Sequence, residues 1–453
     1  PAPPTPAAAP AVSDRARPLR AAATDLVEAT RQKEPIPHNG KRVLTEIGID
    51  ITAIQPLIDI LIDADAIDFD NRTALFIPIK ADYIDRCMDQ VPRKMKSDPG
   101  WNAFGTGATP PFLYRPGNDD LRPASRKEFK EIVHAAAKNE DVVKIFSLPV
   151  ATNKIVSDYE ASQLMEKGFA GLKMTATRNM SDSEAALLKG KDCWLDGTSL
   201  VTSLGVMKTM VDPFLRSVQI GNNLLLLDLS IAGVSGPQSP EALLTQIHAQ
   251  VLFMMLLAQT ITPGISCIHG GIPDVVGPDG DLSYSSPSQP LLNAAMARIN
   301  LWITGFPSAQ SGGSTSITEV TRQAIEESGN SRDTLRKYGV HIVRHAMGAL
   351  GSLNFFSLEK FIEDCAIERC VNILIRESRA DRGVIPLYFP SDENAMEGIR
   401  EIAEKGNPKN ADHTLKNVDA FMKWEKAINA AAMKRNYYPE LDENVSGFEP
   451  TIL

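Results

Sequence analysis

The chain has 453 residues, of which 43% are apolar and 23% are charged, as in an ordinary globular protein with a large core. Its net charge is -9 and it has no run of five Lys or Arg residues, so a nucleic-acid partner is not expected. The five cysteines are scattered and odd in number, which favours a reducing compartment, the cytoplasm, over a disulfide framework.

The first part of the chain is predicted to form a tail and a helical extension. Residues 1–35 are rich in Pro and Ala and are expected to be a disordered tail and lead-in. Residues 36–124 are expected to form a helix-rich extension. Within it, segments 38–50 and 53–67 repeat their apolar residues about every 3.6 positions.

Neither a signal peptide nor a membrane span is predicted. The N-terminal residues lack the basic region that a signal peptide needs. The most apolar run, residues 251–258, is too short to cross a bilayer and is predicted to belong to a buried helix.

Short β-rich apolar runs and helical patterns alternate through the rest of the chain. The runs predicted to be strands are 142–150, 170–176, 222–233, 264–272, 301–306 and 340–347, with a weaker one near 191–201. Helical patterns such as 239–260 and 288–300 separate most of them, which is typical of a parallel α/β fold. We therefore expect a (β/α)8 TIM barrel over residues 125–453, ending in C-terminal helices, with its chemistry in the loops after the strand carboxyl ends.

One glycine-rich segment, residues 312–323 (GGSTSITEVTRQ), carries the most functional information. It resembles the active-site segment of the trimethylamine methyltransferase superfamily, in which a glycine-rich strand end runs into the pattern T-D-[SA]-K-x-x-D-x-Q. Thr315 and Gln323 match the two ends of that pattern. Glu319 stands where pyrrolysine-containing members carry that residue, so the resemblance implies the non-pyrrolysine branch, which is associated with quaternary amines such as glycine betaine. The alternative for Glu319 is structural, because Ser316-x-x-Glu319 is also a capping box.

Further blocks of the family pattern follow in order over roughly residues 36–435 and include 38–50, 219–275 and 337–369. The chain also departs from the pattern. The family's Asp, Lys and second Asp are replaced, two histidines stand where the family has Asn and Gly, and the C-terminal histidine motif is reduced. These departures are, in order, Ser316, Thr318, Thr321, His341, His345 and the segment 406–414, which keeps His413.

No metal site is expected from the histidines. His341 and His345 lie in a predicted strand, where a separation of four residues spans about 13 Å, too far for one ion. Arg344 and His345, at the end of that strand, are predicted to be polar site residues, whereas His341 is equally well explained as a core residue. His269 ends another predicted strand and precedes a long loop that holds Asp274 and Tyr284. Here the alternative is an ordinary hairpin.

The resemblance implies methyl transfer from a small quaternary amine to the Co(I) corrinoid of a separate partner protein. Aromatic faces bind such cations, and the candidates are Tyr284, Trp302, Phe306, Phe355 and Phe356. The residues expected at the site are Glu319 and His345 as catalytic groups, Arg344, Tyr284, Phe306, Phe356 and Asp274 for the substrate, and His269, Gly270, Gly312, Gly313 and Gln323 for the corrinoid. Two alternatives remain open, a non-catalytic barrel that senses quaternary ammonium compounds and an unrelated barrel lyase. Assembly into a homo-oligomer is compatible with all three.

Overall fold

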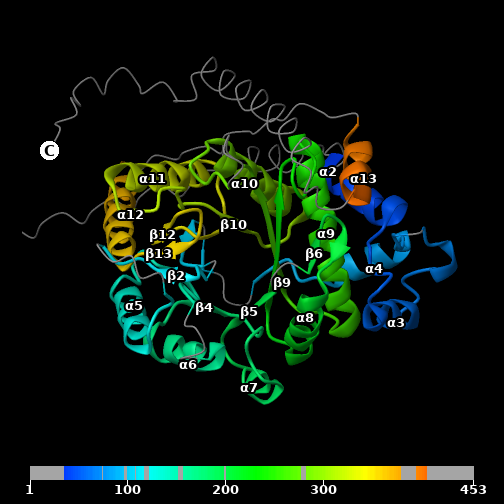
Figure 1. Cartoon of the computed structure of the whole chain (residues 1–453), viewed down its shortest axis with the longest axis horizontal. Coiled ribbons are helices and arrows are strands. Elements are labelled where there is room, and N and C mark those ends of the chain that lie inside the picture. The colour runs from blue at the N-terminus through cyan, green and yellow to red at the C-terminus, as the bar shows by residue number, and fades with distance from the viewer. Residues whose placement is uncertain are drawn as a thin grey trace, which may run out of the picture.

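A computed structural model describes residues 35–378 and 394–405, with gaps at 74, 96–98, 101, 108, 117–121, 152–156, 198–199 and 277–281. Strands lie inside the molecule and helices surround them (Figure 1). The predicted tail, except for Pro35, lies outside the described residues, as does His413.

The extension contains short helices. They are α2 (Pro35–Arg42), the π-helix η1 (Val43–Ile47), α3 (Gln55–Asp63), the 3-10 helix η2 (Phe69–Asn71) and α4 (Ala81–Gln90). In α3, Pro56 stands in the first turn, where its missing N–H is tolerated, and Leu57, Ile58 and Leu61 form the buried face.

Parallel strands form two sheets. One has the order β3 (Ile145–Ser147), β4 (Leu172–Thr175), β5 (Trp194–Gly197), β8 (Leu224–Ile231) and β9 (Cys267–Asp274). The other has the order β1 (Ala103–Phe104), β11 (Ile342–Arg344) and β10 (Ala309–Ser311). Single parallel bridges join Gly105 to Ile145 and His269 to Ser308, and so connect the edges of the two sheets. The predicted α/β class with parallel strands is confirmed.

Helices alternate with these strands along the chain. They are α5 (Arg126–Lys138), α6 (Asp158–Gly168), α7 (Asp182–Ala186), α8 (Lys208–Ile220), α9 (Pro240–Ile261), α10 (Ser288–Arg298), α11 (Arg322–Lys337), α12 (Leu358–Ser378) and α13 (Ala395–Lys405). Two small additions accompany these elements. They are the hairpin of β6 (Val201–Thr202) and β7 (Gly205–Val206), and the sheet of β12 (Ala349–Leu350), β13 (Phe355–Phe356) and β2 (Phe112–Leu113).

Side chains on the inner strand faces pack into one apolar cluster. It takes one or two residues from each strand of the two sheets just described. They are Ala103, Ile145, Leu172, Met174, Trp194, Leu225, Ile268, Ala309 and Ile342. Because neighbouring residues on a strand point to opposite faces, this cluster fixes which residues of each strand face inward.

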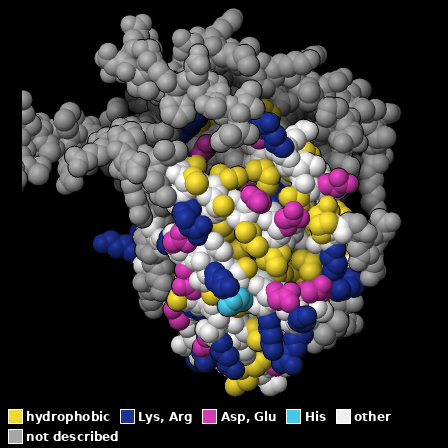
Figure 2. Space-filling model, turned by 90° about the vertical axis from the view of Figure 1, so that its left-hand side faces the viewer, with side chains coloured by type: hydrophobic (Ala, Val, Ile, Leu, Met, Phe, Trp, Pro, Cys, Tyr) yellow, Lys and Arg dark blue, Asp and Glu magenta, His cyan; other side chains and the backbone are white. Residues whose placement is uncertain are grey.

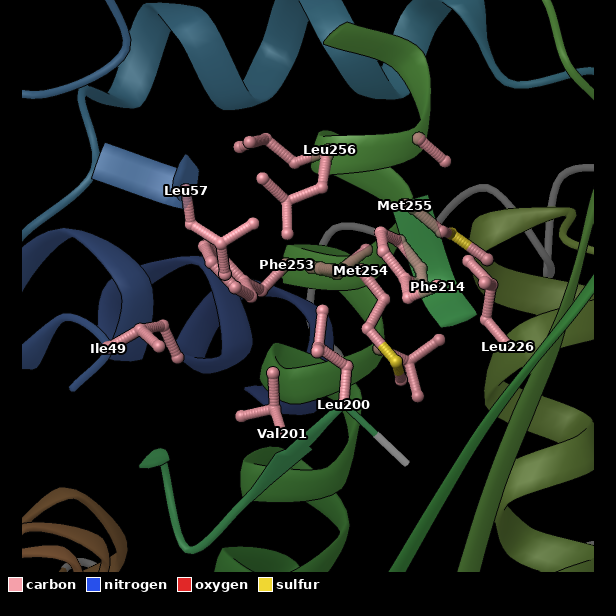
Figure 3. Close-up of a cluster of buried hydrophobic side chains, with 14 of the residues drawn as sticks. Ile49, Leu57, Leu200, Val201, Phe214, Leu226, Phe253, Met254, Met255 and Leu256 are labelled. Atoms are coloured by element: carbon pink, nitrogen blue, oxygen red, sulfur yellow. The ribbon is translucent and has the colours of Figure 1, made fainter. Parts of the chain in front are cut away.

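The helix α9 is almost wholly buried. Figure 3 shows its side chains, among them Phe253 and Leu256, between Ile49 and Leu57 of the extension on one side and Leu226 of β8 on the other. In the described part of the chain it is the one helix long and apolar enough to cross a membrane, but that apolar stretch is entirely inside the protein. The predicted buried helix is confirmed, and the extension and β8 together cover its two sides.

The face of the molecule that carries α5 and α12 has a mixed surface. Figure 2 shows apolar side chains near its centre with acidic and basic side chains around them. Ile362 of α12 is 49% exposed, whereas Phe129 and Ile132 of α5 are buried. This is the pattern of amphipathic helices that bury one side against a core.

One predicted strand is wrong. Residues 301–306 do not form a strand, because a π-helix, η3 (Ile299–Thr304), continues directly from α10. Gly305, at φ +73°, then ends the helix, and the strand of this region is β10, which begins at Ala309. A short apolar run does not by itself distinguish a buried strand from a buried helical turn.

Candidate functional site

Polar side chains follow the inner apolar cluster toward the carboxyl ends of the strands. Ser147, Asp196, Ser311 and Arg344 each stand two residues beyond a member of that cluster on β3, β5, β10 and β11. A step of two residues keeps a side chain on the same strand face. The four side chains therefore form a polar layer above the apolar one, at the strand ends where parallel α/β folds bind their ligands.

Arg344 and Asp196 form a buried ion pair in this layer. The Arg344 Nη2 donates to Asp196 Oδ2 at 2.8 Å and to Ser147 Oγ at 3.3 Å. The Arg344 side chain is only 2% exposed. Its Nε and Nη1, and Asp196 Oδ1, find no hydrogen-bond partner within the described part of the chain. Because an unpaired buried donor is costly, these N–H groups are suited to a polar ligand.

Gly107 leaves space beside this arginine. A Cβ atom at position 107 would lie 3.1 Å from Arg344 Nε and 3.3 Å from His345 Cδ2, and the backbone there has φ +155°. A larger side chain at position 107 would compete for the space next to the Arg344 Nε.

His345 follows Arg344 in a left-handed backbone conformation, with φ +61°. Its Nδ1 lies 2.8 Å from Ser311 Oγ. Burial and the neighbouring Arg344 charge hold the pKa of His345 well below its usual range. The imidazole is therefore neutral at pH 7 and acts here as a hydrogen-bonding group rather than a cation.

Asp274 and Tyr284 extend the polar layer on the β9 side. Asp274 stands an even number of residues after Ile268 on β9, so its side chain points to the same, inner face. Burial raises the pKa of Asp274 to about 7, although hydrogen bonds from the Val275 N–H and Tyr284 lower it. Burial and the Asp274 carboxylate raise the pKa of the Tyr284 hydroxyl, and a hydrogen bond with Ser311 opposes them. Ser311 therefore touches both Tyr284 and His345 and joins the two halves of the site.

Three other predicted site residues lie in packing contacts. His269 faces α9, where its Nε2 is 3.1 Å from His248 Nδ1 and its ring stacks on Phe306. Phe306 precedes β10, at the strand end opposite the polar layer, and Arg93 lies 3.9 Å above its ring. Phe356 packs against Phe361 in the core.

The predicted corrinoid-binding glycines are packed against the chain itself. A Cβ at Gly270 would lie 2.7 Å from Leu227 Cδ2, and a Cβ at Gly312 would lie 2.1 Å from Leu335 Cδ1. Gly313 has φ +84°, and its Cβ would lie 2.5 Å from the Ala346 carbonyl oxygen. These glycines allow close packing between strands, loops and helices, so they leave no open cradle.

Glu319 lies in the loop between β10 and α11, Gln323 lies in the first turn of α11, and both are exposed. The capping-box alternative for Glu319 is wrong, because α11 begins at Arg322 and its N-cap is Thr321, whose hydroxyl accepts from the Ala324 N–H at 3.2 Å. Gln323 donates to Glu327 at 2.9 Å.

A buried ionic network supports the loop after His345. Arg332 donates to Asp364 at 2.9 Å and to the Ala346 carbonyl at 2.8 Å. Asp364 in turn accepts from the Gly348 N–H at 2.9 Å and from Lys360 at 2.7 Å. The loop that holds His345 in its unusual conformation is thus fixed to α11 and α12.

Sequence reasoning brought Arg344, His345, Asp274 and Tyr284 to one region but missed Asp196. The sequence did contain a signal for Asp196, since this acid directly follows the apolar residues of β5. In the residues that the structure describes there is no group of three or more His, Cys, Asp or Glu residues placed to hold a metal ion.

Comparison with known proteins assigns the family. Residues 6–431 match the family model described as Trimethylamine methyltransferase (MTTB). The chain is also 25% identical over 420 residues to the glycine betaine methyltransferase of Desulfitobacterium hafniense (strain Y51), covering 85% of this chain and 83% of that protein. The chain therefore belongs to the trimethylamine methyltransferase family.

Proposed function

We propose that this protein transfers a methyl group from a small quaternary amine that carries a carboxylate, such as glycine betaine, to the corrinoid of a partner protein. The observation that carries the proposal is the buried Arg344, whose Nε and Nη1 lack partners in the described part of the chain. Family membership and the name of the relative support the same chemistry.

We also propose that the two parallel sheets form one closed (β/α)8 barrel. The support is the strand pairing, in which β11 pairs with both β1 and β10 and single bridges connect β1 to β3 and β9 to β10. The inner cluster, which draws on every one of these strands, has the form of a barrel interior. A closed barrel directs all the carboxyl ends to one mouth and so brings Asp196 and Arg344 together.

Arg344 is proposed to bind the substrate carboxylate. A guanidinium offers two parallel N–H groups to a carboxylate, and Asp196 occupies only Nη2. A substrate held by its carboxylate has a defined orientation, and orientation is the main contribution such an enzyme makes to an in-line displacement.

The ammonium end is proposed to lie near Tyr284. Its aromatic ring attracts a methylated cation without the strength of a full carboxylate charge. The positive charge on the nitrogen decreases in the transition state. A carboxylate in contact with the nitrogen would therefore stabilise the ground state more than the transition state and slow the reaction. Asp274, whose pKa is about 7, is partly protonated at neutral pH, which reduces that penalty. The quaternary nitrogen leaves as a neutral tertiary amine, so the chain has no proton to supply.

The bound corrinoid supplies a Co(I) nucleophile for the methyl group. The packed glycines do not fit a role in holding it, whereas the exposed residues Glu319 and Gln323 fit contact with a group presented from outside. We propose that this surface faces the partner protein and that Glu319 is a catalytic group that acts on the corrinoid presented by that partner. The scattered cysteines support a cytoplasmic location.

Calorimetric titration of the protein alone tests the substrate assignment. Glycine betaine is expected to bind. Choline, which has the same ammonium group without a carboxylate, is expected to bind at least about tenfold more weakly because it leaves the Arg344 donors unpaired. Trimethylamine is expected to bind more weakly still. Choline binding as tight as glycine betaine binding would overturn the role of Arg344.

A further inference from the structure

A second set of polar contacts connects the loops that enclose the site. Glu327, on α11, is its centre. Its Oε2 accepts from the hydroxyls of Thr315 and Ser285, each at 2.5 Å, and its Oε1 accepts from Gln323 Nε2 at 2.9 Å. One carboxylate therefore reaches the loop after β9, the loop after β10 and the start of its own helix.

Each of the two hydroxyls also accepts a hydrogen bond from a main-chain amide. Ser285 Oγ accepts from the Ser316 N–H at 3.0 Å, and Thr315 Oγ1 accepts from the Ile317 N–H at 3.1 Å. Each hydroxyl donates its hydrogen to Glu327 and accepts from a main-chain amide, so every donor in these contacts has an acceptor.

The loop after β11 joins the same set. The Ser352 N–H donates to the Thr315 carbonyl at 2.9 Å, and Ser352 Oγ donates to the Leu282 carbonyl at 2.6 Å. Ser316 Oγ donates to the same Leu282 carbonyl at 3.4 Å. Three loops at the carboxyl ends of neighbouring strands are thus held to one another.

We propose that Glu327 is a positioning residue that fixes these three loops and, through Ser285, sets the place of the adjacent Tyr284 in the site. This also gives a physical reason for the two ends of the glycine-rich segment, because Thr315 and Gln323 both donate to Glu327. Tyr284 contacts the amine only if the proposed function holds, so the effect of Glu327 on turnover rests on that function. Its effect on the loops does not.

Hydrogen exchange of the full chain tests the loop role directly. In E327A, the Ser316 and Ile317 amide hydrogens are expected to exchange about tenfold faster or more, because their acceptor hydroxyls lose their anchor. The amides of α11 away from residue 327 are expected to change little. E326A is the matched control, since Glu326 is the neighbouring exposed acid and its side chain pairs with Arg322. Unchanged loop exchange in E327A would overturn the proposal.

Kinetics distinguish positioning from general stabilisation. E327A is expected to raise the KM for glycine betaine about tenfold. E327Q is expected to recover most of that loss, because its amide oxygen still accepts from both hydroxyls. Equal loss in E327A and E326A would contradict the positioning role. Fast loop exchange in E327A, with no methyl transfer by the wild type, would leave the loop role standing and reject the proposed function.

S285A provides a second route if E327A does not fold. It removes the acceptor of the Ser316 N–H but leaves Thr315 with the Ile317 N–H. Exchange is therefore expected to accelerate at Ser316 and not at Ile317. Acceleration at neither amide would overturn the proposal independently of E327A.

Discussion

Arg344 combines burial, one ion pair and two donors that have no partner among the described residues, and its replacement tests the proposed substrate contact. R344Q is expected to weaken glycine betaine binding by about 10- to 100-fold, the range for losing charge-assisted hydrogen bonds. R344K is expected to recover only part of that loss, because an ammonium has no planar fork. Calorimetric titration of each variant with glycine betaine measures both effects.

Choline provides the control for this prediction. R344Q leaves the Asp196 carboxylate without its cation, so choline binding is expected to stay the same or to strengthen. An equal loss for choline and glycine betaine would show that R344Q damages the site as a whole and would contradict a specific carboxylate contact.

Single residues also show how far the sequence alone could predict the site. Arg344 and His345 were predicted from their place at a strand end and Asp274 from a long loop after a strand, and they lie together around Ser311. His269 was predicted to end its strand, but β9 runs on from Cys267 to Asp274. The His269 side chain faces α9, because one residue decides which side of a strand a side chain takes. Which face each residue of the strand takes can be decided only once the residues of the inner cluster are known. Glu319 was ambiguous, and only the start of α11 at Arg322 removes the capping alternative.

The contact between β8 and α9 contains a buried acid that makes folding depend on pH. Asp228 accepts from Gln250 at 2.7 Å and from Ser230 at 3.0 Å, and burial raises its pKa to about 8. A carboxyl whose pKa is raised by folding stabilises the fold at low pH, and this contribution is lost as pH rises toward the folded pKa. Between about pH 4 and pH 8, stability falls by up to about 1.4 kcal/mol per pH unit from this group.

D228N removes this titration and keeps an oxygen that accepts from Gln250 and Ser230. Its free energy of unfolding at pH 8 is expected to exceed that of the wild type by about 1–3 kcal/mol, with a smaller difference at pH 5. Denaturant unfolding at both pH values measures it, and D63N, at an exposed position of α3, is the control. A constant difference between D228N and wild type at both pH values would refute a neutral buried Asp228.

Elements were predicted well where their pattern was long and poorly where it was short. The helix 239–260 was predicted almost to its observed ends, since Ser239 caps it and Pro240 opens it. The run 301–306 was misassigned because the π-helix that continues α10 is as apolar as a buried strand. The two-residue strand β1 carries too little pattern to be predicted at all.

At the scale of the whole molecule, the extension completes the core. Ile49 and Leu57 cover the outer side of α9, which would otherwise expose an apolar face (Figure 3). The sequence predicted the extension and the apolar helix separately but not their contact, because their pairing joins segments some two hundred positions apart. The proposed closed barrel was expected from the alternation of strands and helices along the sequence. The support for closure comes from pairings that involve very short strands.

Methyl transfer to free cob(I)alamin tests the central proposal most directly. The absorbance spectrum reports conversion of cob(I)alamin to methylcobalamin, and the tertiary amine product is measured in parallel. With the wild-type protein and glycine betaine, methylcobalamin and dimethylglycine are expected to form in equal amounts, whereas trimethylamine is expected to give neither methylcobalamin nor dimethylamine. Demethylation of trimethylamine at a comparable rate, or tight binding of glycine betaine without any methylcobalamin, would contradict the account.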